Sequence, residues 1–361
     1  MNYKTFILIN LMLFLFSHLS AQSSSETRSF IKTVKVGKET SLEVINKYGT
    51  IQVTSWKKDS AYIRAEVKAS GSSQEKISRM FDGITVNITS AGSLVRAQTN
   101  FNQGMNSLFE SFKGMTSKII SYDSRVEIDY YVNVPEYLNL KIENKYGDVY
   151  IEDCSGNFSI SISNGSFKAN SLGKESTISM SFCDATINSV LSGKIDASFS
   201  EVSSNDMGNL TISSISSKYN IKNAGEIAFE SRRDKFIIDT IESMKGNSYF
   251  TDFNVKYLKK EISLTTRYGN IDAGFIEKEF EAINLNSGYS DISLNFDPES
   301  SYSLDIRHIN TFLVLPSKNV KTEQKTLNEE KKEYITSGTV GTGQVSAKVK
   351  IDATRGKVYI K

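Results

Sequence analysis

The chain is built around the stretch LEVINKYGTIQV, from Leu42 to Val53, which returns as LKIENKYGDVYI, from Leu140 to Ile151. In both copies two short runs of alternating apolar residues flank a Tyr-Gly pair, and related units recur about every 18 residues. Alternation with a period of two is typical of β-strands with one buried face and one wet face. The sequence is therefore that of a repeat protein whose unit is strand, turn and strand.

The repeat keeps one register along most of the chain. With Gly49 and Gly147 at position zero, apolar residues fall at minus seven, minus five, plus two and plus four. The further zero positions are Gly165, Ala185, Val202, Ser217, Asp234, Thr251, Gly269, Ser290, Thr311 and Gly356. Gly, Asn and Asp at the turn are expected to supply the left-handed backbone that a sharp corner needs.

One unit is too small to bury its own apolar face, and stacking the units as rungs solves this. The predicted fold is all-β: a single-stranded parallel β-solenoid, similar to a β-helix, with an antiparallel β cap near the N-terminus. About ten consecutive rungs run from Gly147 to Thr311. The alternative is an antiparallel sandwich of hairpins. The short, nearly constant links between copies favour stacking.

The sequence divides into five segments on this interpretation. They are a signal peptide (1–21), a first rung plus antiparallel β cap (22–135), a β-solenoid of about ten rungs (136–316), a charged loop or hairpin (317–345) and a final rung (346–361).

The N-terminus has the pattern of an export signal. Lys4 is the only charge before an apolar run from Phe6 to Phe16 that is too short to span a bilayer comfortably, and Ala21 is a plausible cleavage point. We therefore expect an exported protein of the periplasm or cell surface.

Segment 101–119 interrupts the cap region. Its apolar residues, from Phe101 to Ile119, fall at helical spacing and predict an amphipathic arm. The arm either covers a sheet edge or contacts a membrane surface or a partner.

Charge and cysteine content exclude some functions. The chain has 43 Lys and Arg against 41 Asp and Glu, a net charge of +2, so it lacks the basic excess that binds nucleic acid. Cys154 and Cys183 do not occupy equivalent positions in the repeat, which favours two free or buried thiols over a disulfide.

No catalytic motif stands out. His308 is the only histidine after the signal, and nothing near it marks a nucleophile, so a structural role is expected. Phosphate-cradling, zinc-binding and nucleophile-elbow motifs are missing from the sequence. We predict a protein that is not an enzyme, and we assign no catalytic, cofactor-binding or metal residues.

Stacking nevertheless suggests two carboxylate groupings. Asp184 and Glu201 share position minus one on adjacent rungs, about 5 Å apart, near the spacing used by retaining glycosidases. Asp252, Asn270 and Asp291 share position plus one on three rungs and present oxygens of the kind that bind Ca²⁺. Both groupings lie at corners, where Asp and Asn are common for structural reasons.

The outward positions form columns of small polar residues. The minus-four column is Glu143, Ser161, Ser181, Ser198, Ser213, Glu230, Asn247, Thr265 and Asn286. The plus-three column is Tyr150, Lys168, Asn188, Asn205, Asn220, Ile237, Asn254, Asp272 and Ser293. These columns are either a solvated sheet surface or a repetitive hydrogen-bonding face for a glycan or a protein.

The Tyr-Gly turns, the strand ending in Val132-Asn133-Val134-Pro135, and Gly341-x-Gly343 followed by Ile351-x-Ala353-Thr354-Arg355-Gly356 carry a resemblance. The chain resembles the "putative adhesin" family of exported bacterial proteins, first described as a domain of unknown function and expected to form a β-solenoid. The resemblance covers about Phe30 to Lys361 and implies no established enzyme activity, cofactor or catalytic residue.

The leading hypothesis is a non-enzymatic adhesin or cell-envelope scaffold that binds a glycan or an envelope protein through its polar faces. One alternative is a carbohydrate-active β-helix that uses Asp184 and Glu201. The other is a periplasmic interaction or sensing module that docks a partner through segment 101–119.

Overall fold

The computed structural model describes residues 24–105 and 124–361, and strands predominate within them. The elements are β1 (Ser24–Lys35), β2 (Ser41–Lys47), β3 (Ile51–Ser55), β4 (Ser60–Gly71), α2 (Gln74–Asp82), β5 (Ile84–Ala91), β6 (Leu94–Phe101), β7 (Ser124–Val134), β8 (Asn139–Lys145), β9 (Val149–Cys154), β10 (Phe158–Leu172), β11 (Ser176–Ser198), β12 (Glu201–Ile215), β13 (Lys218–Arg232), β14 (Lys235–Tyr249), β15 (Asp252–Arg267), β16 (Asn270–Ile276), β17 (Ala282–Phe296), β18 (Tyr302–Val314), β19 (Val320–Asn328), β20 (Glu333–Val340) and β21 (Ala347–Ile360). The predicted all-β class is confirmed.

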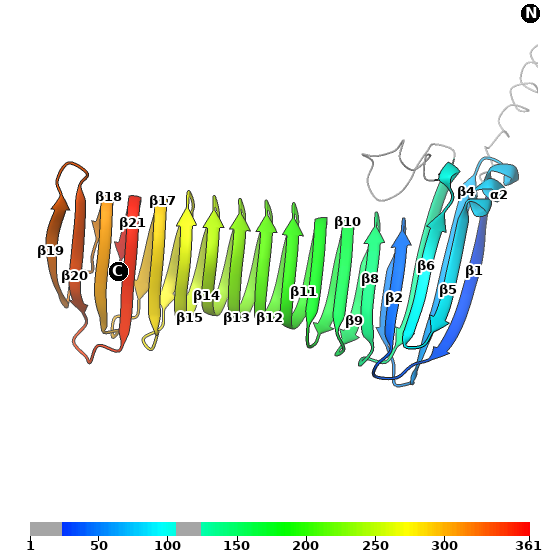
Figure 1. Ribbon diagram of the computed structural model, residues 1–361, viewed down its shortest axis with the longest axis horizontal. Helices are drawn as coiled ribbons and strands as arrows, with labels where there is room; N and C mark the ends of the chain where they lie inside the picture. The colour runs from blue at the N-terminus through cyan, green and yellow to red at the C-terminus, as the bar shows by residue number, and fades with distance from the viewer. Residues whose placement is uncertain (1–23, 106–123) are drawn as a thin grey trace, which may run out of the picture.

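The repeat units lie side by side as rungs joined by parallel ladders (Figure 1). β8 and β9 pair in parallel with β10, β10 with β11, and the series continues through β12, β13 and β14 to β15. Equivalent positions are partners, so that Ile142 lies beside Ile160 and Ile160 beside Ile178. Each rung therefore supplies backbone hydrogen bonds to the next, and side chains form columns along the stack.

The core fills the space between the strand before each corner and the strand after it. Tyr219, Phe236 and Phe253 stack on adjacent rungs with ring centroids 4.5 and 5.1 Å apart. Phe229, from the strand before the corner, meets the rings of Phe236 and Phe253 edge-on at 4.8 and 5.2 Å. Gly246 lies beside Phe229 in the next rung, where a Cβ would collide with the Phe229 carbonyl oxygen.

The corner departs from the expectation in one respect. The left-handed residue is the one before the glycine: φ is 68° at Tyr48 and 57° at Tyr146, while Gly49 and Gly147 keep negative φ. The glycines are needed for close approach instead, because a Cβ on Gly147 would collide with the carbonyl oxygen of Gly49. The prediction for the turn residues was therefore wrong for Gly49 and Gly147, whereas Asn164 (φ 55°) and Asn310 (φ 46°) supply the left-handed backbone at their corners as expected.

In the central rungs a side chain replaces the backbone acceptor at the corner. The backbone N–H of Cys183 donates to Oγ of Ser200 (3.1 Å), and that of Ser200 donates to Oγ of Ser217 (3.2 Å). The N–H of Ser217 donates in turn to Oδ1 of Asp234 (2.7 Å). Burial raises the pKa of the Asp234 carboxyl. Each corner donor is thus satisfied by a residue of the following rung.

The N-terminal cap is only partly antiparallel, in contrast to the expectation for 22–135. β6 and β7 continue the stack, pairing in parallel with β2 and β3. Beyond them β5 pairs antiparallel with β6, and β4 and β1 add antiparallel strands to β7. The helix α2 packs across this end of the stack and buries Ile77, Met80 and Phe81 (Figure 1).

The C-terminal end departs from sequence order. β21, the last strand of the chain, lies between β17 and β18 and pairs in parallel with both (Figure 1). Segment 317–345 contains β19 and β20, which form an antiparallel hairpin. β20 pairs antiparallel with the outer edge of β18, and together the two strands cover that edge.

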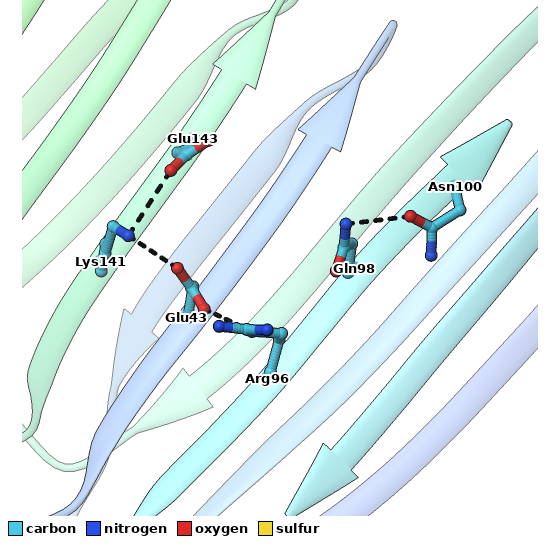
Figure 2. A network of polar contacts seen from close by, with 6 residues as sticks. All are labelled: Glu43, Arg96, Gln98, Asn100, Lys141 and Glu143. Atoms are coloured by element: carbon cyan, nitrogen blue, oxygen red, sulfur yellow. Dashed lines mark hydrogen bonds and ion pairs between the residues drawn. The ribbon is translucent and has the colours of Figure 1, made fainter.

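One charged network fastens the cap to the stack (Figure 2). Glu43 on β2 is buried and accepts hydrogen bonds from Arg96 on β6 (2.5 Å) and Lys141 on β8 (2.8 Å). Lys141 also approaches Glu143 at 3.6 Å. The hydrogen bond from Lys141, aided by Arg96, holds the pKa of Glu43 below its usual value.

The aromatic cluster yields a first prediction. Phe236→Ala should lower the free energy of unfolding by about 3–5 kcal/mol, because it opens a cavity among fully buried rings. Urea denaturation followed by circular dichroism measures the change. Phe250→Ala is the control: its ring is 47% exposed, so we expect a loss of about 1 kcal/mol or less. Equal losses in the two variants would contradict this account of the core.

The Glu43 network yields a second prediction. Since its folded pKa is depressed, Glu43 stabilises the fold above its unfolded pKa of about 4.3, and this contribution is lost as pH falls through the lower folded value. Glu43→Gln should therefore cost about 1–3 kcal/mol at pH 7 and much less at a second, acidic pH that lies below the folded pKa of Glu43. Glu143→Gln, at the neighbouring glutamate whose side chain is 45% exposed, should cost less than about 0.5 kcal/mol. Thermal unfolding at both pH values checks the pattern, which a pH-independent loss in Glu43→Gln would rule out.

Candidate functional site

The stack has two outer faces, one on each side of the corner. The serine face comprises Ser179, Ser181, Asp196, Ser198, Ser213, Glu230 and Asn247. The asparagine face comprises Lys168, Asn170, Thr186, Asn188, Ser203 and Asn205. Grooves of about 690 and 820 Å³ lie along the serine and asparagine faces respectively.

The predicted columns are displaced by two residues in two rungs. Cys183, not Ala185, lies beside Gly165, and Ser200, not Val202, occupies the next corner. The minus-four column therefore contains Ser179 and Asp196 in place of Ser181 and Ser198, and the plus-three column contains Thr186 and Ser203 in place of Asn188 and Asn205. The remaining rungs keep the predicted phase.

The displaced asparagines form a ladder of their own. The Nδ2 of Asn205 donates to Oδ1 of Asn188 (2.7 Å), and that of Asn188 donates to Oδ1 of Asn170 (3.1 Å). Asn170 donates to Oδ1 of Asp153 (2.8 Å). The asparagine ladder thus consists of four side chains from consecutive rungs joined by hydrogen bonds along the groove.

The serine face is linked less continuously. The hydroxyls of Ser181 and Ser198 are 3.0 Å apart, and Nδ2 of Asn247 donates to Oε1 of Glu230 at 2.9 Å.

A further column of side chains lies at the corner, at positions where the sequence pattern predicts only a turn. This aromatic ladder comprises Phe182, Phe199, Phe250, Tyr268 and Tyr289, all at left-handed positions with φ between 51° and 57°. The ring centroids of Phe182 and Phe199 are 5.0 Å apart, and those of Phe250 and Tyr268 are 4.9 Å apart. Every ring in the ladder is exposed.

The displaced register concealed this ladder, because it placed Phe182 and Phe199 away from the minus-one position. A signal was nevertheless present. Left-handed corners favour Gly or Asn, so bulky aromatic residues recurring at a corner indicate that the ring has a role beyond the turn.

The structure brings the two predicted carboxylates together, since Asp184 and Glu201 are partners on adjacent rungs. Both are exposed. Glu201 is paired with Lys218 (2.8 Å), and this hydrogen bond lowers the pKa of the glutamate. A glycosidase acid requires a raised pKa, so the environment of Glu201 opposes that role.

Asp252, Asn270 and Asp291 also lie on adjacent rungs as expected. Their oxygens have partners already: Asn270 donates to Asp252 through its Nδ2 (2.8 Å), and the N–H of Lys357 donates to Asp291 (3.0 Å). Within residues 24–105 and 124–361, no group of three His, Cys, Asp or Glu side chains is arranged to hold a metal ion.

His308 is buried in the C-terminal part of the stack, where burial lowers its pKa. Its Nε2 lies 3.3 Å from Oγ1 of Thr336. Its ring also lies beside that of Tyr334, at 5.3 Å. These contacts are those of a structural histidine.

The cysteines are free and buried, as expected. The Sγ of Cys154 contacts the carbonyl oxygen of Leu138 (3.6 Å), and burial raises its pKa to about 11. A thiol with so high a pKa is a poor nucleophile.

Two predicted segments fall outside the described residues: the signal peptide (1–21) and most of the arm (101–119). At the start of the arm, Phe101 ends strand β6, residues 103–105 are helical, and Met105 is buried beside Gly83. In the described part of the chain, no helix has the length and apolar character needed to span a bilayer.

The carboxylate contacts at the plus-one corner yield a prediction. Because Asp252 and Asp291 already accept hydrogen bonds, millimolar Ca²⁺ should leave the melting temperature unchanged within about 1 °C. Differential scanning calorimetry with CaCl2 and with EDTA measures the effect. A stabilisation by Ca²⁺ that disappears in Asp252→Asn would show instead that the column binds the ion.

Comparison with known proteins places bacterial "putative adhesins" among the solved structures that this chain resembles. No family model and no curated protein matches it. A "putative cell adhesion protein" from Clostridium sporogenes is 12% identical, with 93% of this chain and 99% of that chain covered and a TM-score of 0.22. A "putative adhesin" from Parabacteroides distasonis is 9% identical over 75% of this chain and 97% of that one, with a TM-score of 0.30. A "putative lipid binding protein" from the same organism is 11% identical over 93% and 97%, with a TM-score of 0.31. Likenesses at this level assign no function to the present chain.

Proposed function

We propose that this chain is a non-enzymatic β-solenoid, exported to the periplasm or cell surface, that acts as an adhesin or envelope scaffold by binding an extended glycan. The observation that carries the proposal is the asparagine ladder on the asparagine face. The proposed location rests on the export pattern of residues 1–21.

The asparagine ladder leaves hydrogen-bonding capacity for a ligand. An asparagine side chain has two N–H donors and a carbonyl oxygen with two lone pairs. In Asn188 one donor is used by Asn170 and one lone pair by Asn205. The second donor and the second lone pair remain, and the side chain is exposed. Asn170 has the same pattern, since it donates to Asp153 and accepts from Asn188, and two such amides on adjacent rungs suit a ligand with repeated hydroxyls.

The hydrogen bonds along the ladder also fix the rotamers of its members. Binding to a surface that is already ordered avoids part of the entropy loss that free side chains suffer. Asn170, Asn188 and Asn205 come from strands joined by parallel ladders, so their spacing is set by the backbone.

A glycan fits this groove better than a protein does. Protein interfaces depend on a few large apolar or aromatic anchors that become fully buried. Among the described residues that line the groove, the large apolar side chains are buried or half-buried, as at Ile187, Ile221 and Ile237. The groove exposes the amides and hydroxyls of the asparagine face together with the charged side chains of Lys168, Lys222, Glu152 and Asp239.

The enzymatic alternative has weaker support. Asp184 and Glu201 are adjacent, but Lys218 and Asn220 both donate to Oε1 of Glu201, at 2.8 and 3.1 Å. A carboxylate held ionised in this way is a poor proton donor. The partner-docking alternative relies on segment 101–119, whose greater part lies outside the described residues.

Two asparagine variants test the proposal. Asn188→Ala breaks the ladder at its centre and should weaken binding to the best ligand on a glycan array about tenfold, as expected for one or two lost hydrogen bonds. The matched control is Asn247→Ala on the serine face, which loses a comparable hydrogen bond to Glu230 and should bind like the parent.

Dissociation constants from calorimetry provide the comparison. Parent protein that binds nothing on the array, or equal weakening by both variants, would contradict the proposed role of the asparagine face.

A further inference from the structure

The aromatic ladder is interrupted at two consecutive rungs, and the interruption forms a notch. Ser216 and Arg233 occupy the aromatic position there, between Phe199 on one side and Phe250 on the other. The order is fixed by the parallel pairs Glu201–Lys218, Lys218–Lys235 and Lys235–Asp252. Three rung steps separate Phe199 from Phe250, or about 14 Å. The notch has a volume of about 670 Å³.

Two aromatic rings wall the notch. Phe199 stacks on Phe182, and Phe250 stacks on Tyr268, in each case on the side away from the notch. One face of each ring is thus covered by its stacked neighbour. Both rings line the notch together with Ser216 and Arg233. The rings are 55% exposed at Phe199 and 47% exposed at Phe250.

The cations inside the notch are only partly neutralised. Lys218 is paired with Glu201 at 2.8 Å. Within the described residues, the side chains of Arg233 and Lys235 form no ion pair or hydrogen bond, and both are exposed. The carboxylate between them, Asp234, is buried and accepts hydrogen bonds from Ser217, Ser231 and Arg232. Two cations therefore remain available to an anion.

Charge on either side limits which anion fits. Asp184 and Glu201 line one end of the notch, and Asp252, the strand partner of Lys235, lines the other. A polyanion with a charge on every unit would meet these carboxylates and be repelled. A ligand with one negative charge between neutral units matches the pattern.

We propose that the notch binds a single carboxylate-bearing sugar within an otherwise neutral glycan. The C–H face of a pyranose ring packs on the electron-rich face of Phe199 or Phe250. Arg233 and Lys235 donate charge-assisted hydrogen bonds to the carboxylate. The choice of a glycan rests on the proposed function, but the notch lies at the corner and is separate from the asparagine face.

The test uses the full chain with sialyllactose, which carries one carboxylate, and lactose, which carries none. Calorimetry should show sialyllactose binding at least about tenfold more tightly than lactose, and Arg233→Gln should abolish that preference. Phe199→Gly and Phe250→Gly should weaken sialyllactose binding about tenfold. Glycine suits the φ of 51° and 54° at these positions, so both variants keep the backbone of the parent.

Tyr289→Gly is the control, since Tyr289 belongs to the same ladder and has a φ of 57° but stacks on Tyr268 and not on either wall of the notch. It should bind like the parent. Equal binding of the two sugars by the parent, no binding of either, or unchanged preference in Arg233→Gln overturns the proposal. Tighter binding of oligothymidylate than of sialyllactose overturns it in favour of a nucleic acid.

The asparagine-face proposal is tested separately. If Asn188→Ala weakens glycan binding while all notch variants bind like the parent, the asparagine face stands as the glycan site and the notch proposal falls. If the notch variants behave as expected while Asn188→Ala binds like the parent, the asparagine face is excluded and the notch proposal is retained.

Discussion

The structure depends on how each rung turns its corner. A residue with positive φ reverses the chain, and the next backbone N–H would be left without a partner inside the molecule. In the central rungs Ser200, Ser217 and Asp234 each accept that N–H from the preceding rung. A buried donor without an acceptor is destabilising by about 1–3 kcal/mol, so these contacts fix which residue stands at which corner. The register of both sheets, and hence the composition of every column, follows from this choice.

Neighbouring residues at the corner have different roles. The residue at position zero points inward and serves the backbone, as Asp234 does, while its neighbours on either side point outward. Keeping a phenylalanine in the left-handed region costs about 1–2 kcal/mol, which ring stacking offsets only in part. Phe182, Phe199 and Phe250 nevertheless occupy left-handed positions, where glycine would remove this energetic cost. At the exposed corner, the chain therefore presents aromatic rings to the solvent at a cost to local stability.

Much of the fold could be predicted from the sequence, because a period-two pattern repeated at near-constant spacing leaves few alternatives to stacked strands. Register was less certain, since moving a strand by two residues keeps the same side chains inward. The sequence pattern therefore places Ala185 and Val202 at corners that Cys183 and Ser200 occupy, and it leaves Asn170 out of the column that contains Asn188 and Asn205. The notch could not be predicted, because it exists only when Phe199 and Phe250 are correctly aligned around Arg233.

The position of β21 bears on how the molecule forms. Residues 347–360 fill a slot between β17 and β18, two strands that precede them in the chain. The strands as far as β17 can join the stack before β21 is made, whereas β18 pairs with β20 and β21 and reaches the stack through the last strand. Until β21 has formed, the edges of β17 and β18 that face it remain unpaired. Unpaired strand edges recruit other chains. Before this insertion, the two unpaired edges can therefore be captured by a chaperone or by another copy of the chain.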